Sequence, residues 1–422
     1  MTTQLSSGTA SAMQEVLDRA TSRPSPSIPG LVYGSVNRHG DLLFKHASGG
    51  KGLDSAQPMS LDTVFYMASC TKLITSIACM QMVEQGKLNL DDVNQLESLA
   101  PELKAVKVLE RTSDGGFELV PKKRGITLRM LLNHTSGFGY AFEDLKLRDW
   151  SRPLGMDDFS GHEADVLHRP LVNQPGTTFQ YGVGVDWAGR LVERVMGMSL
   201  EDYFQRYILR PIGIGSITFF PSPEMIDKLA YMHQRAPDGT LSVTDHIYRY
   251  PLLPCRPDEK DKRFCMGGAG CFGKPVEFCQ LISVLLNDGT HAKTGTQLLK
   301  PETVAEMFKD QIPDKPRYCN EYTPSGKPLL ANPCPLVPCA DDLTEGWGLS
   351  FSLSHRKSDT GRAAGSGSWE GLANLFWFAD RENGVGAIIA SQILPYGDLR
   401  VLENMDKVEK MMYDELLGSW LT

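Results

Sequence analysis

Apolar residues near the start of the chain fall into two short runs, at positions 31–37 and 42–47, separated by the polar residues 38–41. Runs of this length, joined through a turn that contains Gly40, predict a β-hairpin. The segment before them, 10–21, has the spacing of an amphipathic helix and ends at a proline-rich stretch. We therefore expect the chain to begin with a helix and two antiparallel strands.

The spacing of apolar residues changes at Thr71. From there, apolar side chains recur every three or four positions until Gly86, and glycine is frequent directly after a helix. Similar helical spacing recurs later, and the C-terminal part returns to short apolar runs typical of buried strands. Further helices are expected at 128–133, 185–196, 278–286, 301–307 and 401–417, and strands at 347–354, 372–379 and 386–391.

This order of elements predicts an α+β fold, with an antiparallel β-sheet flanked by helices. Strands do not alternate regularly with helices, which disfavours a doubly wound parallel sheet. A chain of 422 residues exceeds the size at which one hydrophobic core stops growing. We expect residues 1–88 and 216–422 to form an α/β sheet domain, and residues 89–215 to form an inserted, mostly helical domain.

The amino-acid composition of the chain argues against several classes of function. The formal net charge of −8 argues against a nucleic-acid partner, because phosphate binding requires a basic surface. We expect no membrane span, since no apolar run approaches the roughly 20 residues that one requires. The first residues have no secretory-signal pattern, and nine cysteines are an odd number for a disulfide framework. These features favour a cytoplasmic protein with free thiols. No spacing of potential ligand residues indicates a metal site or another cofactor.

Ser69 and Lys72 form the first candidate for chemistry, at the start of the helix that begins near Thr71. A serine hydroxyl is a poor nucleophile until a base takes its proton, and residues three apart share one face of a helix. Lysine can act as that base only when burial or neighbouring charge lowers its pKa. Taken alone, this spacing is equally typical of a helix N-cap followed by a surface lysine.

Tyr181 is a second candidate, because it follows a Pro-Gly turn and precedes the helix expected at 185–196. A phenol at this place can share a proton with Lys72 and pass it to a leaving group. The alternative is a half-buried core tyrosine. The chain has no Gly-x-Ser-x-Gly segment, which counts against an α/β-hydrolase.

Several segments together resemble the superfamily of serine β-lactamases and penicillin-binding proteins. Within it, the chain is similar to the class C β-lactamase-related esterases, and most of all to the fungal transesterases that acylate the statin precursor monacolin J. The similarity runs in order through nearly the whole chain. The matching segments are Met67-Ala68-Ser69-Cys70-Thr71-Lys72-Leu73, Ile126-Thr127-Leu128-Arg129, His134-Thr135-Ser136-Gly137, Tyr181-Gly182, Asp186-Trp187-Ala188-Gly189, Pro211-Ile212-Gly213-Ile214 and Gly267-Gly268-Ala269-Gly270.

The resemblance implies Ser69, Lys72 and Tyr181 as catalytic residues and a third motif on a strand. We assign that motif to Trp369-Glu370-Gly371, which precedes the apolar run 372–379. Trp369 and Gly371 would then contact substrate, and the backbone N–H groups of Ser69 and Leu372 would form the oxyanion hole. A packed aromatic residue at a strand start is the alternative interpretation of Trp369.

Three further positions bear on how closely the chain follows the superfamily pattern. Lys293-Thr294-Gly295 matches a common third motif, but we expect it in a polar loop between two helices. Val183 stands where β-lactamases have an asparagine, so an amide used to bind a β-lactam is missing. The resemblance gives His134 a structural role.

The function implied by the resemblance is acyl transfer through a Ser69 acyl-enzyme. The acyl group would come from a small thioester or ester, with an acyl carrier protein as one candidate donor, and would pass to a hydroxyl of a small secondary metabolite. A carboxylesterase is the alternative, and Val183 and Trp369 disfavour a β-lactamase or D-peptidase. A non-catalytic binding protein has no reason to retain Ser69, Lys72 and Tyr181 together. Loops 140–149 and 245–257 are expected to shape the substrate pocket.

Overall fold

A seven-stranded antiparallel β-sheet lies at the centre of the protein, in the strand order β11-β12-β13-β14-β15-β1-β2. The computed structural model describes residues 4–254, 263–336 and 342–418. The strands of the whole structure are β1 (Gly30–Asn37), β2 (Leu42–Gly49), β3 (Phe65–Tyr66), β4 (Lys107–Arg111), β5 (Phe117–Pro121), β6 (Met232–Arg235), β7 (Leu241–Thr244), β8 (Phe272–Gly273), β9 (Thr290–His291), β10 (Thr296–Gln297), β11 (Glu345–Trp347), β12 (Ser352–Ser354), β13 (Gly367–Gly371), β14 (Leu375–Asp380), β15 (Val385–Ala390) and β16 (Ile393–Leu394).

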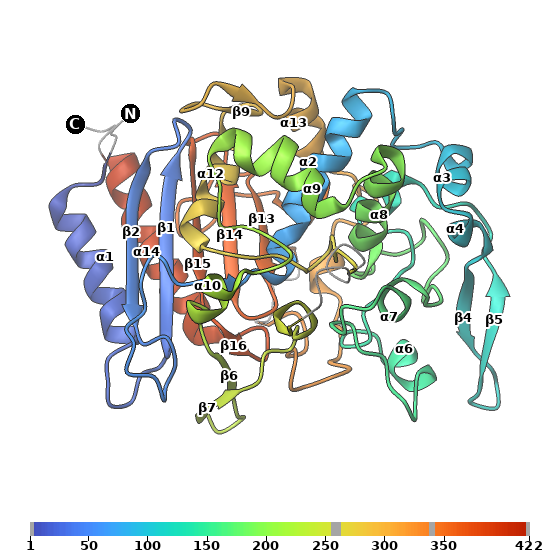
Figure 1. Ribbon diagram of the computed structural model, residues 1–422, viewed down its shortest axis with the longest axis horizontal. Coiled ribbons are helices and arrows are strands. Elements are labelled where there is room, and N and C mark those ends of the chain that lie inside the picture. The colour runs from blue at the N-terminus through green and yellow to red at the C-terminus, as the bar shows by residue number, and fades with distance from the viewer. Residues whose placement is uncertain (1–3, 255–262, 337–341, 419–422) are drawn as a thin grey trace.

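Helices cover both faces of the sheet and form most of the part drawn on the right of Figure 1. The longer ones begin and end where the apolar spacing predicts, within a few residues. The helices are α1 (Ser7–Ala20), η1 (Ala68–Cys70), α2 (Thr71–Glu84), α3 (Val93–Leu99), α4 (Pro101–Ala105), α5 (Leu128–Leu132), α6 (Leu145–Trp150), α7 (Glu163–Leu167), α8 (Gly184–Met196), α9 (Leu200–Phe204), η2 (Gln205–Leu209), η3 (Arg210–Ile212), α10 (Pro223–Asp227), η4 (Tyr250–Leu252), α12 (Pro275–Leu286), α13 (Pro301–Met307), η5 (Tyr318–Asn320) and α14 (Leu399–Gly418).

The two faces of the sheet pack against different helices. Tyr33 and Ile389 point to the face covered by α1 and α14, whereas Val32 and Ile388 belong to the core on the α12 side. All residues of β14 and β15 are buried. Burial on both faces explains why these strands read as continuous apolar runs instead of alternating ones.

The antiparallel sheet built from both chain ends confirms the predicted fold class, because β1 pairs with β15 over Val32 to Asn37. Residues 89–215 contain helices α3 to α9, but also the hairpin β4–β5, which the apolar spacing did not indicate. Both strands of that hairpin are short and largely exposed, so they carry no periodic apolar signal. The division into two domains stays a prediction.

Two expected strands were wrong in detail. The run 347–354 is the hairpin β11–β12, with Ser350 in the left-handed region at φ 76°. The run 372–379 begins with a turn, and β14 starts only at Leu375. Trp369, Glu370 and Gly371 therefore lie on a separate strand, β13, and Leu372 lies in the turn between β13 and β14.

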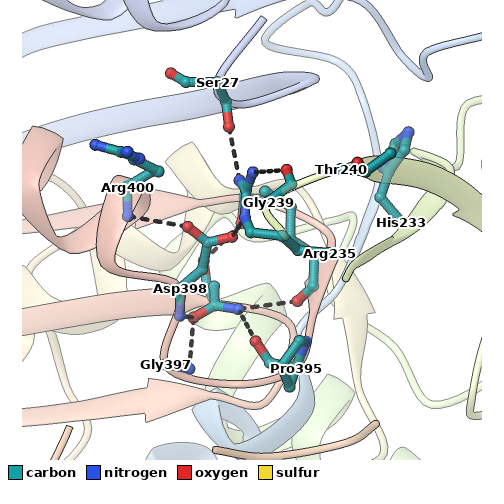
Figure 2. A network of polar contacts seen from close by, with 12 residues as sticks. Ser27, His233, Arg235, Gly239, Thr240, Pro395, Gly397, Asp398 and Arg400 are labelled. Atoms are coloured by element: carbon teal, nitrogen blue, oxygen red, sulfur yellow. Dashed lines mark hydrogen bonds and ion pairs between the residues drawn. The ribbon is translucent and has the colours of Figure 1, made fainter. Parts of the chain in front are cut away.

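The turn after β13 is fixed by a buried polar network, part of which Figure 2 shows. The Asn374 side chain accepts hydrogen bonds from the backbone N–H groups of Gly397 (2.9 Å) and Asp398 (2.8 Å). Asp398 pairs with Arg235 of β6 at 2.6 Å, and Arg235 also donates to the Ser27 carbonyl at 2.6 Å. Segments from four parts of the chain thereby hold one turn of the sheet in place.

Within the described ranges, no helix combines the length and apolar character needed to cross a lipid bilayer.

Candidate active site

Ser69 lies in η1, directly before α2, on a backbone with an unusual conformation. Ala68 has φ 45°, the left-handed region that non-glycine residues rarely adopt. The Thr71 hydroxyl donates to the Ala68 carbonyl at 2.7 Å, and the Met67 N–H donates to the Cys271 carbonyl at 2.9 Å. Such strain persists only where the surroundings enforce it, which is frequent at functional sites.

Lys72 is fully buried, and its amine points at Ser69. The distance from Lys72 Nζ to Ser69 Oγ is 3.1 Å. The amine also donates to the Gly268 carbonyl at 2.8 Å and to the Tyr140 hydroxyl at 3.3 Å. Burial lowers the pKa of Lys72 from 10.5 to about 8, although the carboxylate of Asp186 opposes this shift. With a pKa of about 8, roughly a tenth of Lys72 is the neutral amine at pH 7, the form that a general base requires.

Tyr181 lies in the loop before α8 and contacts the same serine oxygen. Its hydroxyl donates to Ser69 Oγ at 2.7 Å and accepts from the Trp369 indole Nε1 at 3.1 Å. Burial raises the pKa of Tyr181 well above its usual value, so the phenol stays protonated. Tyr181 is thus suited to donate a proton, whereas Lys72 is suited to accept one.

Strand β13 brings the predicted third motif to the same place. Gly371 lies so close to the segment before Ser69 that a Cβ atom there would be 2.8 Å from the Met67 carbonyl oxygen. Leu372 follows Gly371 and lines the cavity beside Ser69. The close approach places the Leu372 backbone near Ser69, and its part in an oxyanion hole stays a prediction.

A cavity of about 180 Å³ opens onto Ser69. Eight of its eighteen lining residues are aromatic, with carboxyl groups and cysteine side chains between the rings. Of the two loops expected to shape the pocket, 140–149 supplies lining residues, residues 245–254 do not, and 255–257 lie outside the described residues. The lining residues are Ser69, Tyr140, Phe142, Glu143, Phe159, Phe179, Gln180, Tyr181, Tyr318, Cys319, Glu321, Thr323, Cys334, Trp369, Glu370, Gly371, Leu372 and Tyr396.

Tyr140, Glu143 and Glu370 lie at this site, although the sequence alone assigns none of them an individual role. Tyr140 contacts Lys72, and Glu370 accepts a hydrogen bond from Tyr396. Burial raises the pKa of Glu143 to about 8 and that of Glu370 to about 7. Tyr140 and Glu143 lie in the loop 140–149 that was expected to shape the pocket, and Glu370 lies within the predicted third motif.

The two segments set aside as alternatives lie where the sequence led us to expect. Lys293 is in the turn between β9 and β10, about half exposed, with its Nζ 3.4 Å from Asp41. His134 is buried with its ring centroid 4.7 Å from that of Tyr181, and its Nδ1 accepts the Gly182 N–H at 3.4 Å. Burial lowers the pKa of His134 well below its usual value, so it packs as a neutral ring.

Comparison with known proteins identifies the family of this chain. The family model described as Beta-lactamase matches residues 14–409. The chain belongs to the β-lactamase family. It is 32% identical over 391 residues to monacolin J acid methylbutanoyltransferase of Aspergillus terreus, covering 89% of each protein. It is 35% identical over 387 residues to lovastatin esterase of Penicillium rubens, covering 88% of this chain and 91% of the esterase.

Two solved structures have the same architecture as this chain. A mutant of simvastatin synthase from Aspergillus terreus superimposes with a TM-score of 0.79 at 29% identity, over 98% of this chain and 96% of the other. A hydrolase with promiscuous acyltransferase activity superimposes with a TM-score of 0.69 at 19% identity, over 96% and 98%, and this likeness concerns the fold alone.

Proposed function

We propose that this protein is a serine acyltransferase that forms an acyl-enzyme at Ser69 and passes the acyl group to a hydroxyl of a small polyketide-like acceptor. The observation that carries the proposal is the convergence of two groups on one oxygen: Lys72 Nζ at 3.1 Å and Tyr181 OH at 2.7 Å from Ser69 Oγ. The relatives named as a methylbutanoyltransferase and as simvastatin synthase support the reaction class.

In the proposed reaction, neutral Lys72 takes the proton of Ser69 as the serine oxygen attacks the acyl carbonyl. The C=O electron pair moves to the carbonyl oxygen, which the N–H groups of Ser69 and Leu372 stabilise. When the intermediate collapses, the bond to the leaving sulfur or oxygen breaks, and Tyr181 protonates the departing atom. The Lys72 ammonium then returns a proton to Tyr181. Deacylation reverses these roles, with the acceptor hydroxyl as the nucleophile.

The cavity suits a flat acceptor, because rings such as Phe142, Phe179 and Trp369 provide broad apolar contacts. We propose a small thioester or ester as the acyl donor, and an acyl carrier protein is the macromolecular form of the same donor. Neither nucleic acid nor a membrane has a part in the proposed reaction. Among the residues that the structure describes, Cys70, Cys79, Cys265, Cys271, Cys279 and Cys334 are free thiols, which supports a cytoplasmic setting.

Mass spectrometry of the intact protein after mixing with a short-chain acyl thioester tests the proposal. We expect one added acyl group, located on Ser69 after proteolysis, and no such adduct in Ser69→Ala. Because Cys319 and Cys334 also line the cavity, the peptides containing them must be mapped in the same digest. An unmodified Ser69 with acyl groups only on cysteine would refute the assignment.

Lys72→Ala separates the roles of the two partners of Ser69. Removing the amine should reduce the acylation rate at neutral pH by about 100-fold or more, the usual contribution of a general base. An unchanged rate would show that another group accepts the Ser69 proton.

Hydrolysis of small esters is the second candidate function, and the 35% identity to lovastatin esterase favours it. Acyl transfer and hydrolysis share the acyl-enzyme and differ only in whether an alcohol or water removes the acyl group. Increasing concentrations of a polycyclic alcohol should divert the acyl group from the free acid to the ester. If alcohols never compete with water, the protein is an esterase.

A further inference from the structure

Asp186, in the first turn of α8, is a fully buried carboxyl group with an incomplete set of partners. Its Oδ1 accepts the Gly268 N–H at 2.9 Å, whereas Oδ2 has no hydrogen-bond partner among the residues that the structure describes. Burying a carboxylate in this way is costly unless a positive charge lies nearby. Burial raises the pKa of Asp186, and two buried cations oppose that rise: the Lys72 ammonium, which has the larger effect, and Arg169, which is paired with Asp158.

Gly268 connects Asp186 to Lys72. While its N–H donates to Asp186, its carbonyl accepts from Lys72 Nζ at 2.8 Å. A Cβ atom at this position would lie 2.3 Å from Asp186 Oδ2, so any side chain here would displace the carboxyl group. Thr75 holds the preceding residue by donating to the Gly267 carbonyl at 2.6 Å. The segment 267–270, which the sequence indicated only through its resemblance to a family, thus packs tightly between the Asp186 carboxyl group and the Lys72 amine.

The groups around Lys72 divide into those that favour its charged form and those that do not. Asp186 and Glu143 raise the pKa of Lys72, and the Cys70 thiol contributes in the same direction. Burial lowers the pKa of Lys72 and outweighs these contributions. The side chains of Tyr140, Tyr181 and His134 lie near the amine and carry no charge. Among these groups, Asp186 is the acidic residue whose contribution to the Lys72 pKa is largest.

We propose that Asp186 is the third member of a Ser69–Lys72–Asp186 relay. It is a positioning residue that orients the Lys72 amine through Gly268 and balances the ammonium formed when Ser69 gives up its proton. In that step the Ser69 O–H bond breaks and an Nζ–H bond forms, so a positive charge develops in a fully buried place. A carboxylate that stabilises a protonated base in this way performs the role that aspartate has in a Ser-His-Asp triad. The inference rests on the proposed acyl transfer at Ser69.

Asp186→Asn tests the relay, because asparagine keeps an oxygen for the Gly268 N–H and nearly the same shape while removing the negative charge. The readout is the single-turnover acylation rate of Ser69 from a p-nitrophenyl ester between pH 5.5 and 10. We expect the pH midpoint of the rising limb to move down by about 1 to 2 units, because an opposite charge near Lys72 is lost. We also expect the plateau rate to fall by about 10- to 100-fold, part of the usual contribution of general base catalysis.

Glu193→Gln is the matched control on the same helix, since Glu193 pairs with Arg190 away from Lys72 and its loss should not move the midpoint. Gly268→Ala is a second test, because its Cβ atom would separate Asp186 from Gly268, and it should also shift the midpoint downward. A lower plateau with an unmoved midpoint in both variants would show a merely structural role and overturn the relay. Failure of the unsubstituted protein to acylate Ser69 would instead refute the proposed function.

Discussion

Replacing Gly371 with alanine tests whether the turn after β13 helps to stabilise the oxyanion. The new Cβ atom would lie 2.8 Å from the Met67 carbonyl oxygen and 3.2 Å from the Leu375 side chain. The first distance is shorter than real Cβ contacts, and both atoms belong to well-packed elements. The end of β13 must therefore move away from the segment that carries Ser69. The N–H of Leu372 follows directly and moves with it.

The expected effect on catalysis is larger than the effect on folding. A donor in an oxyanion hole must lie about 2.7–3.1 Å from the developing charge, and loss of one donor costs about 3 kcal/mol, or about 100- to 1,000-fold in rate. Inserting one methyl group into a packed site costs about 1–3 kcal/mol of stability. Gly371→Ala should consequently remain folded while its acylation step becomes slow.

The assay is the burst of p-nitrophenol released when Ser69 is acylated, measured by stopped flow together with a thermal unfolding curve. Gly215→Ala is the matched control, because a Cβ atom at Gly215 meets nothing within 4 Å. We expect the control to retain the burst rate of the unsubstituted protein. A folded Gly371→Ala variant whose burst rate stays within about threefold of the control would refute a role for Leu372 in the oxyanion hole.

Three further outcomes follow from the site. Trp369→Phe removes the hydrogen-bond donor to Tyr181 and should lower kcat about fivefold with little change in KM, as loss of one neutral hydrogen bond predicts. An unchanged kcat in steady-state kinetics would show that Trp369 only packs. Lys293→Ala should keep kcat/KM within about twofold, because surface ion pairs contribute little, and a collapse of activity would restore Lys293-Thr294-Gly295 as a motif. The acylation rate should rise about tenfold from pH 7 to 9, since Lys72, with a pKa of about 8, is the active base only when neutral; a flat pH profile would exclude it.

Residues close together in the sequence were the easiest part of the site to predict. Ser69 and Lys72 are three residues apart, so helical geometry allows the hydroxyl and the amine to meet, although the spacing alone also fits a helix N-cap followed by a surface lysine. Tyr181 was a candidate from its place after a Pro-Gly turn, but its pairing with Ser69, and the choice of Trp369, came from the resemblance to a family. Gly268 entered only as part of a matching segment, because neither its backbone carbonyl nor its N–H leaves a chemical signature in the sequence.

Buried turns were the hardest part of the fold to predict. Leu372 and Ala373 are apolar and buried, so they read as the start of a strand although they form a turn. The deciding residue is Asn374, at φ 62°, whose side chain bonds to the backbone of residues 393–398 and replaces the ladder contacts that a strand would make. Those partners follow about 20 residues later in the chain, beyond the reach of local periodicity.

The pairing of β1 with β15 has a consequence for synthesis on the ribosome. Asn37 of β1 lies opposite Val385 of β15, about 350 residues later, so the N-terminal hairpin emerges long before its neighbour in the sheet. At about 5–20 residues per second, the apolar edge of β1 waits roughly 20 to 70 s for its partner. During that interval it is an unpaired strand edge open to association with other chains. Recombinant yield should therefore depend on chaperones and temperature more than the stability of the finished protein would suggest.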